Sequence, residues 1–255
     1  MISVRLRKHF GHARTPFTLH VDYSIGPEQK RVAFFGPSGS GKSLTLHCLA
    51  GLVRPDSGRI RLGGRVLYDG AARVFVPARR RRIGYMFQDY ALFPHLTVLQ
   101  NVAYARTGCF PRLMRAEERD KAQAMLERFG IGHLAELRPD NLSGGQRQRA
   151  AMARALNADP ELLLLDEPFS ALDTLLRERL RQELLEILAM LTIPAVIITH
   201  DPEDVDVFAS GLILYNNGHA RPVPEYRDLR TSFASAGQCL RHLQEKTVFA
   251  GQSGL

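Results

Sequence analysis

The sequence predicts an α/β fold built on a parallel sheet, and three observations lead to that class. A short apolar strand, Arg31–Phe35, runs directly into the glycine-rich segment Gly36–Ser43, and a helical pattern follows. Leu162–Leu165 is a run of four leucines, which has no polar face and is typical of a strand buried on both sides. The pattern between these features is mainly helical, so we expect a helical insertion between about Gln88 and Asp159.

The other elements follow in alternating order. We expect strands at Val4–Phe10, Phe17–Ile25, Arg31–Phe35, Arg59–Leu62, Val66–Tyr68, Arg82–Phe87, Leu162–Leu165, Ala195–Thr199 and Leu212–Tyr215. We expect helices at Leu44–Val53, Thr97–Tyr104, Ala116–Phe129, Gly145–Asn157 and Leu172–Leu191. The first two strands should pair antiparallel, and the turn residues 216–219 should bend the last strand into a hairpin.

Composition and charge bound the class of protein. Of the 255 residues 45% are apolar and 24% are charged, which are ordinary values for a globular protein, and no apolar run approaches the roughly 20 residues that span a bilayer. The N-terminus lacks a signal-peptide core, so we expect the chain to stay in the cytosol. Cys48, Cys109 and Cys239 occur singly, which predicts reduced packing thiols rather than a zinc site or disulfides.

The net charge of +8 leaves nucleic acid or an anionic membrane face open as partners. The only dense basic run, Arg79–Arg82, has no interleaved aromatic residue. We therefore interpret it as a solvated basic loop and expect no nucleic acid partner.

The segment Gly36–Ser43, GPSGSGKS, fits the pattern G-x4-G-K-[ST]. Glycines in such a loop let backbone N–H groups close around phosphates, and the following helix offers its positive end. Lys42 adds a mobile charge, and Ser43 would ligate Mg²⁺ beside the terminal phosphates. Leu44 stands where many such loops have a second hydroxyl. The predicted ATP-binding residues are Gly36, Pro37, Ser38, Gly39, Ser40, Gly41, Lys42, Ser43 and Leu44.

Asp166 and Glu167 end the four-leucine strand, at the sheet edge where α/β folds bind ligands. Asp166 would hold Mg²⁺ through water, and Glu167 would orient or deprotonate the attacking water. The alternative is a plain helix start, because acids before a proline favour a helix N-terminus.

A second anion-binding feature is predicted at Leu142–Gln146, which spells LSGGQ. Its S-x-x-Q spacing is that of a capping box, which would open a helix with exposed N–H groups. The residues expected to contact nucleotide are Ser143, Gly144, Gly145 and Gln146. A chain with one phosphate loop and one separate anion site suggests that the second site serves the nucleotide of another copy.

The order of these motifs, with Gln88, the segment 170–173 and His200, resembles the ATP-binding cassette (ABC) ATPase family over nearly the whole chain. The resemblance implies a P-loop NTPase (RecA-like) core that binds ATP and Mg²⁺. It implies that Gln88 senses Mg²⁺ and the attacking water, that Asp173 communicates across a dimer, and that His200 contacts the γ-phosphate. By the same resemblance an aromatic residue stacks on adenine; Phe10 is the best positional match, Phe17 is its rival, and a plain core role is the alternative.

Within this single domain, 1–255, the resemblance implies three parts. Residues 1–87 and 160–230 would form the core with its antiparallel β part, residues 88–159 the helical subdomain, and residues 231–255 a C-terminal tail. Related importers often append a regulatory β-domain, which this tail is too short to form, so we expect no substrate-feedback regulation.

The segment 58–98 is similar to that of importer ATPase subunits, especially those of molybdate uptake, although importers of sulfate, sugar, polyamine and iron carry related segments. The expected function is an ATPase that dimerises around ATP and drives a separate permease on the cytoplasmic face of the membrane, with a solute-binding protein involved indirectly. One alternative is a soluble cassette protein acting on nucleic acid or ribosomes. Another is a binding module without catalysis, which the presence of Lys42, Asp166, Glu167 and His200 opposes.

An apolar cluster in the loop after Gln88 is expected to contact the permease through Tyr90, Leu92 and Phe93. The alternative is that these side chains fold back as ordinary core beneath the helical subdomain.

Overall fold

The computed structural model describes residues 1–11, 16–107, 114–170, 174–190 and 192–246. The chain divides into two compact units. The first unit comprises Met1–Arg81 and Pro194–Leu255, and the second comprises Arg82–Ile193.

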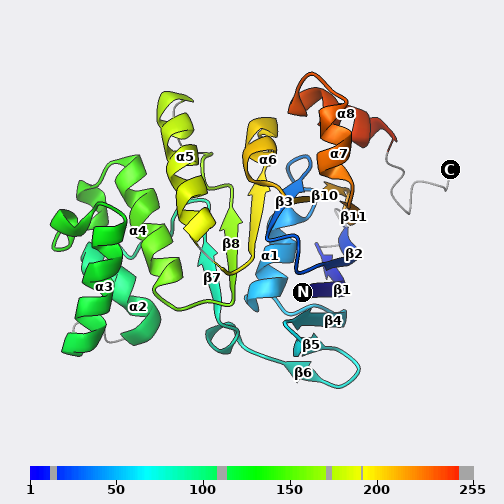
Figure 1. Ribbon diagram of the computed structural model, residues 1–255. Helices are drawn as coiled ribbons and strands as arrows, with labels where there is room; N and C mark the ends of the chain where they lie inside the picture. The colour runs from blue at the N-terminus through cyan, green and yellow to red at the C-terminus, as the bar shows by residue number, and fades with distance from the viewer. Residues whose placement is uncertain (12–15, 108–113, 171–173, 191, 247–255) are drawn as a thin grey trace. The chain divides into compact units, whose positions relative to one another are not determined.

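The first unit is built on a mixed sheet with the strand order β6-β5-β4-β1-β2-β11-β10-β3-β9 (Figure 1). Its strands are β1 Ile2–Phe10, β2 Phe17–Ile25, β3 Arg31–Phe35, β4 Ser57–Leu62, β5 Arg65–Asp69, β6 Val74–Phe75, β9 Ala195–Thr199, β10 Gly211–Asn216 and β11 His219–Val223. The predicted antiparallel pair β1–β2 is confirmed, in register from Ile2↔Ile25 to Phe10↔Phe17. The predicted hairpin is β10–β11, and β3 pairs in parallel with both β9 and β10.

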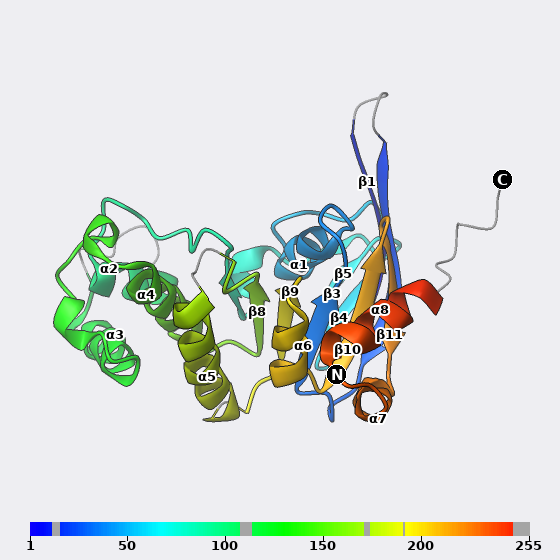
Figure 2. The same cartoon turned by 90° about the horizontal axis from the view of Figure 1, so that it is seen from above.

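The two faces of this sheet carry different helices (Figure 2). The helices of the first unit are α1 Lys42–Ala50, α6 Pro202–Phe208, α7 Tyr226–Thr231 and α8 Ala236–Lys246, with a short 3-10 turn at Ala78–Arg80. Ala33 and Phe35 of β3 face a core that α6, α7 and α8 complete. Phe34 points the other way, toward Tyr23 and Tyr215, on the side where α1 packs. Strand alternation in β3 therefore separates the helix that follows the glycine loop from the C-terminal helices.

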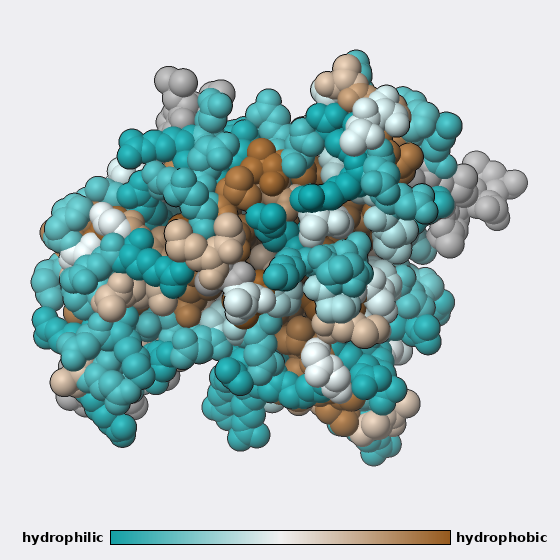
Figure 3. All heavy atoms as spheres, in the orientation of Figure 1, coloured by the Kyte–Doolittle hydropathy of each residue, from teal (hydrophilic) through white to brown (hydrophobic). Residues whose placement is uncertain are grey.

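The described residues of the second unit hold two parallel strands and four α-helices. They are β7 Ile83–Met86, β8 Leu162–Asp166, α2 Val98–Thr107, α3 Ala116–Arg128, α4 Gly144–Leu156 and α5 Thr174–Met190, with 3-10 turns at Gly132–Leu134 and Pro139–Asn141. Every residue of β8 is buried, as its leucine run predicts. Helix α2 packs against α3 and α4, and α4 also packs against β7. Hydrophilic side chains cover most of the region of α3 in Figure 3, because only Ala122 and Leu126 of that helix are buried.

Two sequence-based expectations need correction. Helix α1 ends at Ala50 rather than Val53, because Gly51 adopts a left-handed conformation (φ 79°) and caps the helix. The run Arg79–Arg82 is not wholly solvated: Arg81 is 0% exposed and donates to main-chain carbonyls of Cys48 and Leu49 at 2.7 Å. One arginine of this basic run, Arg81, is therefore buried, and the other three are exposed.

Other expectations about the chain class can be compared directly. Among the described residues, no helix is long and apolar enough to cross a membrane. Cys48 and Cys239 are free and buried, as predicted for packing thiols, and burial raises the pKa of Cys48 to about 12. Cys109 lies outside the described residues.

Candidate functional site

The glycine-rich segment is a tight loop between β3 and α1, as predicted. Gly41 precedes α1 with a left-handed φ of 103°, and Gly39 has a φ of 76°; both conformations favour glycine. A Cβ on Gly36 would lie 2.2 Å from the carbonyl oxygen of Tyr215, so no side chain fits there. The amide of Gly218 donates to the carbonyl of Ser40 at 3.1 Å and ties the loop to the β10–β11 turn. These restraints fix the loop at the N-terminal, positive end of α1.

Lys42 bends back over the loop that precedes it. Its ammonium Nζ donates to the carbonyls of Gly36 and Pro37, both at 2.7 Å. The residue is only 5% exposed. The positive charge is therefore held inside the curve of the loop, where it would attract an anionic group.

His200 lies at the same sheet edge as the loop. Strands β3 and β9 are parallel neighbours with Phe35 paired to Thr199, so the segments that follow both strands leave that edge together. Thr199 donates its hydroxyl to the Asp204 carboxylate at 2.6 Å, and Asp201 caps α6 by accepting from the amide of Glu203. The Thr199–Asp204 hydrogen bond, which was not predicted, joins the end of β9 to α6 on either side of His200 in sequence.

The two candidate adenine-stacking residues face each other at one end of the β1–β2 pair. Phe10 is 38% exposed, and the ammonium of Lys8 lies 5.3 Å from its ring centroid. Phe17 is half-buried, and its ring tip lies 3.3 Å from the point where a Cβ of Gly41 would stand. Phe17 therefore packs against the glycine loop, whereas Phe10 presents more of its ring to solvent.

In the second unit, Asp166 and Glu167 stand at the end of β8, as the sequence predicts. Tyr85 of β7 donates its hydroxyl to Oδ2 of Asp166 at 3.0 Å. Burial and the neighbouring Asp166 raise the pKa of Tyr85 above its usual value, so the phenol keeps its proton and remains a donor. Tyr85 was not predicted, because only the pairing of β7 with β8 in the folded chain brings it to Asp166.

Gln88 and Glu167 follow two parallel strands that lie side by side. The amide Nε2 of Gln88 donates to Oε2 of Glu167 at 3.4 Å; Gln88 is exposed and Glu167 is half-buried. Glu167 adopts a left-handed φ of 46°, an unfavourable conformation for a residue with a long side chain. The hydroxyl and amide of Ser170 both contact the carbonyl of Glu167 and hold this turn. The second unit therefore brings the amide of Gln88 and the carboxylate of Glu167 into hydrogen-bond contact.

The segment Ser143–Gln146 opens α4 with the predicted capping box. The amide of Gln146 donates to Oγ of Ser143 at 3.3 Å, and the amide of Ser143 donates to the Gln146 side chain at 2.9 Å. Ser143 is exposed, while Gly145 is buried. The helix start therefore presents the Ser143 hydroxyl to solvent.

The loop after Gln88 is irregular, but its apolar side chains are not equally accessible. Tyr90 is 7% exposed, which agrees with the core alternative for that residue. Leu92 and Phe93 are half-buried, and the ring of Phe93 lies 4.4 Å from that of Tyr104. Asp173, the remaining predicted site residue, lies outside the described residues.

The residues of the glycine loop fit the phosphates of a nucleotide. Among the described residues, no cluster of three or more His, Cys, Asp or Glu could hold a metal ion. The glycine loop leaves no room for a Cβ at Gly36 and carries its lysine inside the curve, as a phosphate cradle requires. Ser43 and Asp166 offer oxygen atoms, which are the ligands that Mg²⁺ prefers.

Three kinds of comparison bear on this site. The family described as ABC transporter matches residues 20–170. The chain is 38% identical to the molybdenum import ATP-binding protein ModC 1 of Azotobacter vinelandii, over 88% of this chain and 61% of the relative. It is 41% identical to the sulfate/thiosulfate import ATP-binding protein CysA of Neisseria meningitidis, over 84% of this chain and 58% of the relative.

A further relative is the molybdate/tungstate import ATP-binding protein WtpC of Archaeoglobus fulgidus, 40% identical over 85% of this chain and 84% of the relative. The chain thus spans about three fifths of the length of the ModC and CysA relatives. A solved dimer of the cassette MJ0796 in a post-hydrolysis state, bound to ADP and Pi, matches with a TM-score of 0.72 and 29% identity. That match covers 88% of this chain and 98% of the MJ0796 chain.

Proposed function

Because this chain belongs to the ABC transporter family, we propose that it is the ATP-hydrolysing subunit of an importer, which dimerises around ATP and drives a separate permease. The observation that carries this proposal is the glycine loop at the start of α1, with the ammonium of Lys42 held over its own carbonyls. In a site for phosphoryl transfer, such an arrangement would bind the phosphate groups.

The residues of the chain take complementary roles in hydrolysis. The backbone of the loop and Lys42 bind the phosphates and offset their charge. Glu167 positions or deprotonates the attacking water. The Gln88 amide donates to the Glu167 carboxylate and orients that carboxylate. His200 contacts the γ-phosphate from the end of β9, and the exposed ring of Phe10 stacks on adenine, because Phe17 is already packed against Gly41.

Mg²⁺ would be held by Ser43, Gln88 and Asp166, and when bound it offsets charge on the phosphates. The Tyr85 hydroxyl fixes one oxygen of Asp166, which orients the other.

The partners follow from the family and the relatives. A second ATPase subunit would supply Ser143, Gly144, Gly145, Gln146 and Asp173 to the nucleotide of its partner. Leu92 and Phe93, which are half-buried, would contact the permease, while the buried Tyr90 shapes the loop from within. The subunit would lie on the cytoplasmic side of the membrane and meet the solute-binding protein only through the permease. We retain the division into a core, 1–87 and 160–230, a helical subdomain, 88–159, and a tail, 231–255.

We infer that the imported solute is molybdate or a related oxyanion. Three relatives support this choice, because one is named for molybdenum import, one for molybdate and tungstate, and one for sulfate and thiosulfate. The competing solute is ferric iron, because a relative from Rhizobium etli of 41% identity is named for Fe(3+) import. The test is uptake of labelled molybdate and sulfate in membranes that contain the chain with its genomically adjacent permease. Uptake of neither anion, with uptake of another solute, would reject this choice.

The experiment that tests the ATPase proposal uses two variants with separate defects. Wild-type protein should hydrolyse Mg-ATP. Lys42→Ala should lose nucleotide binding, because it removes the charge inside the loop, whereas Glu167→Gln should bind ATP and not hydrolyse it. Equal turnover by wild type and Glu167→Gln would remove Glu167 from the reaction.

A further inference from the structure

The loop that carries Gln88 adopts a conformation that needs outside support. The amide of Tyr90 donates to the carbonyl of Phe87 at 2.9 Å and closes a turn around Gln88. The backbone conformation that follows is unfavourable, because Tyr90 and Ala91 have left-handed φ values of 64° and 46°. Residues other than glycine hold such angles only where their surroundings enforce them.

Arg154 in the last turn of α4 supplies that support. Its two terminal nitrogens donate to the carbonyls of Tyr90 and Ala91, both at 2.7 Å. Its Cζ also lies 5.7 Å from the ring centroid of Phe93. A planar guanidinium can bridge two adjacent carbonyls in this way, and these charge-assisted bonds are stronger than neutral ones.

The rest of the loop is held by a different helix. Asn101 of α2 accepts from the amide of Phe93 and donates to its carbonyl, at 2.8 Å and 3.1 Å. Asn101 also donates to the carbonyls of Leu96 and Thr97. The two residues nearest the Gln88 turn are therefore tied to α4, and the following residues are tied to α2.

Helix α4 links that contact to the predicted nucleotide-contacting segment at its other end. Ser143 caps the helix, and Arg154 lies eleven residues later, about 16 Å along the axis at 1.5 Å per residue. Rigid secondary-structure elements can carry a displacement from one end to the other. A displacement of Ser143 therefore reaches the carbonyls of Tyr90 and Ala91.

We propose that Arg154 is a positioning residue for ATP hydrolysis, which clamps the Gln88 turn to α4 so that Gln88 and Ser143 move together. This inference rests on the proposed function. In a dimer, Ser143 would meet the nucleotide of the partner and Gln88 the nucleotide of its own chain. Arg154 thereby makes the placement of Gln88 depend on whether the partner's nucleotide is engaged.

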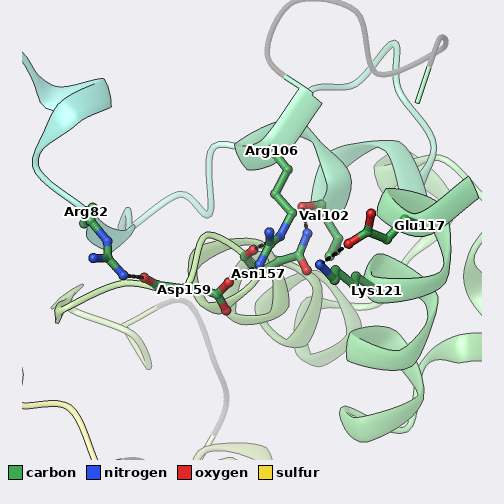
Figure 4. Close-up of polar contacts among 7 residues, drawn as sticks. All are labelled: Arg82, Val102, Arg106, Glu117, Lys121, Asn157 and Asp159. Carbon is green, nitrogen blue, oxygen red and sulfur yellow. Dashed lines mark hydrogen bonds and ion pairs between the residues drawn. The ribbon is translucent and has the colours of Figure 1, made fainter. Parts of the chain in front are cut away.

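Arg106 provides a matched control at the same end of α4 (Figure 4). Its Nε donates to the carbonyl of Asn157, the C-cap of α4, at 2.7 Å, and its guanidinium pairs with Asp159. Arg106 lies in α2, so Arg106→Met removes a contact that an arginine makes with the C-terminal end of α4, without touching the Gln88 loop. Arg154→Met removes the clamp, and Arg154→Lys keeps one charge but cannot bridge both carbonyls.

The first measurement is hydrogen exchange of residues 87–93 in the free subunit. Arg154→Met should speed exchange there by roughly tenfold or more, Arg154→Lys by less, and Arg106→Met should leave this segment unchanged. This measurement needs no nucleotide, so its result stands apart from the ATPase proposal. Unchanged exchange in Arg154→Met would overturn the clamp.

The second measurement is Mg-ATP hydrolysis. We expect Arg154→Met to lower kcat by roughly tenfold or more with KM within about threefold, because phosphate binding is untouched while Gln88 is misplaced. Arg106→Met should keep kcat within about twofold. Wild-type kcat in a folded Arg154→Met protein, or an equal loss in both variants, would overturn the positioning role. If Arg154→Met does not fold, wild-type kcat and exchange in Arg154→Lys would overturn it instead. Absence of hydrolysis in wild type would reject the ATPase proposal, and the exchange result would still decide the clamp.

Discussion

Arg81 shows how one buried side chain can anchor the helix that starts at the phosphate loop. Besides the carbonyls of Cys48 and Leu49, it donates to those of Val76 at 2.7 Å and Leu67 at 3.5 Å. Burial lowers its pKa to about 10, so the cation remains charged at neutral pH. A positive charge beside the last carbonyls of α1 also stabilises the helix dipole.

We therefore predict that Arg81→Met destabilises the protein by about 3 kcal/mol, because several buried carbonyls lose their donor. Urea unfolding measures the change. Arg80→Met is the matched control, because Arg80 is exposed, and it should shift the free energy of unfolding by less than about 0.5 kcal/mol. Equal shifts would show that burial of Arg81 contributes nothing.

A second residue-scale prediction concerns acid stability. Asp56 accepts from the Lys8 ammonium and from the amide of His9, both at 2.7 Å, and these bonds lower its pKa from 3.8 to about 2. Because the folded-state pKa lies below the unfolded value, its contribution is present above about pH 4 and is lost as the pH falls toward 2. Asp56→Asn should cost about 1 kcal/mol or less at pH 7, since the pair is partly exposed, and much less at pH 2, where the folded-state pKa of Asp56 lies. A pH-independent difference between the two proteins would contradict this assignment.

Among single residues, those in motifs with fixed spacing could be predicted from the sequence. A buried charged residue outside any motif could not. Lys42 and Ser143 were predictable because the loop and the capping box are local in sequence. Arg81 was not, since its acceptors lie in α1, β5 and the segment after β6, and only the folded chain brings those carbonyls together.

Helix α4 begins after a residue, Ser143, that caps the helix and that we propose also contacts nucleotide. Ser143 caps the helix, so Ser143→Ala should lower the free energy of unfolding by about 0.5–1 kcal/mol. Ser143→Asp is the matched variant, because aspartate caps as well as serine and should leave stability unchanged. Thermal or urea unfolding of both variants separates the cap from any other role. A larger loss in Ser143→Asp than in Ser143→Ala would refute the capping role.

Most elements followed from periodicity, whereas β6, α6, α7 and the eleven-residue α8, which lies in the predicted tail, were not predicted. The all-apolar β8 and the alternating β1–β2 pair carry strong local signals. The strand β6 has two residues and no pattern. Helices α6 and α7 are short, with seven and six residues, so they owe their stability to packing on the sheet, which the sequence does not display.

At the scale of the whole molecule, the chain has two separate features that we propose to bind anions. The glycine loop belongs to the first unit, and the N-terminus of α4 belongs to the second. In the proposed function, the loop and Lys42 bind the phosphates of the chain's own nucleotide. The exposed Ser143 at the helix start would then contact the nucleotide of another copy.

This arrangement predicts an assembly that forms only with ATP. In Glu167→Gln, which should bind ATP without consuming it, light scattering at micromolar protein should show twice the monomer mass with Mg-ATP and the monomer mass with Mg-ADP. Ser143→Asp in that background should return the mass to that of the monomer, because a carboxylate repels the γ-phosphate while the cap is kept. Arg106→Met in the same background should still dimerise, since Arg106 lies at the opposite end of α4 from Ser143. A monomer with Mg-ATP in Glu167→Gln would reject the nucleotide-bridged dimer for the isolated subunit, and a dimer that survives Ser143→Asp would place the contact elsewhere.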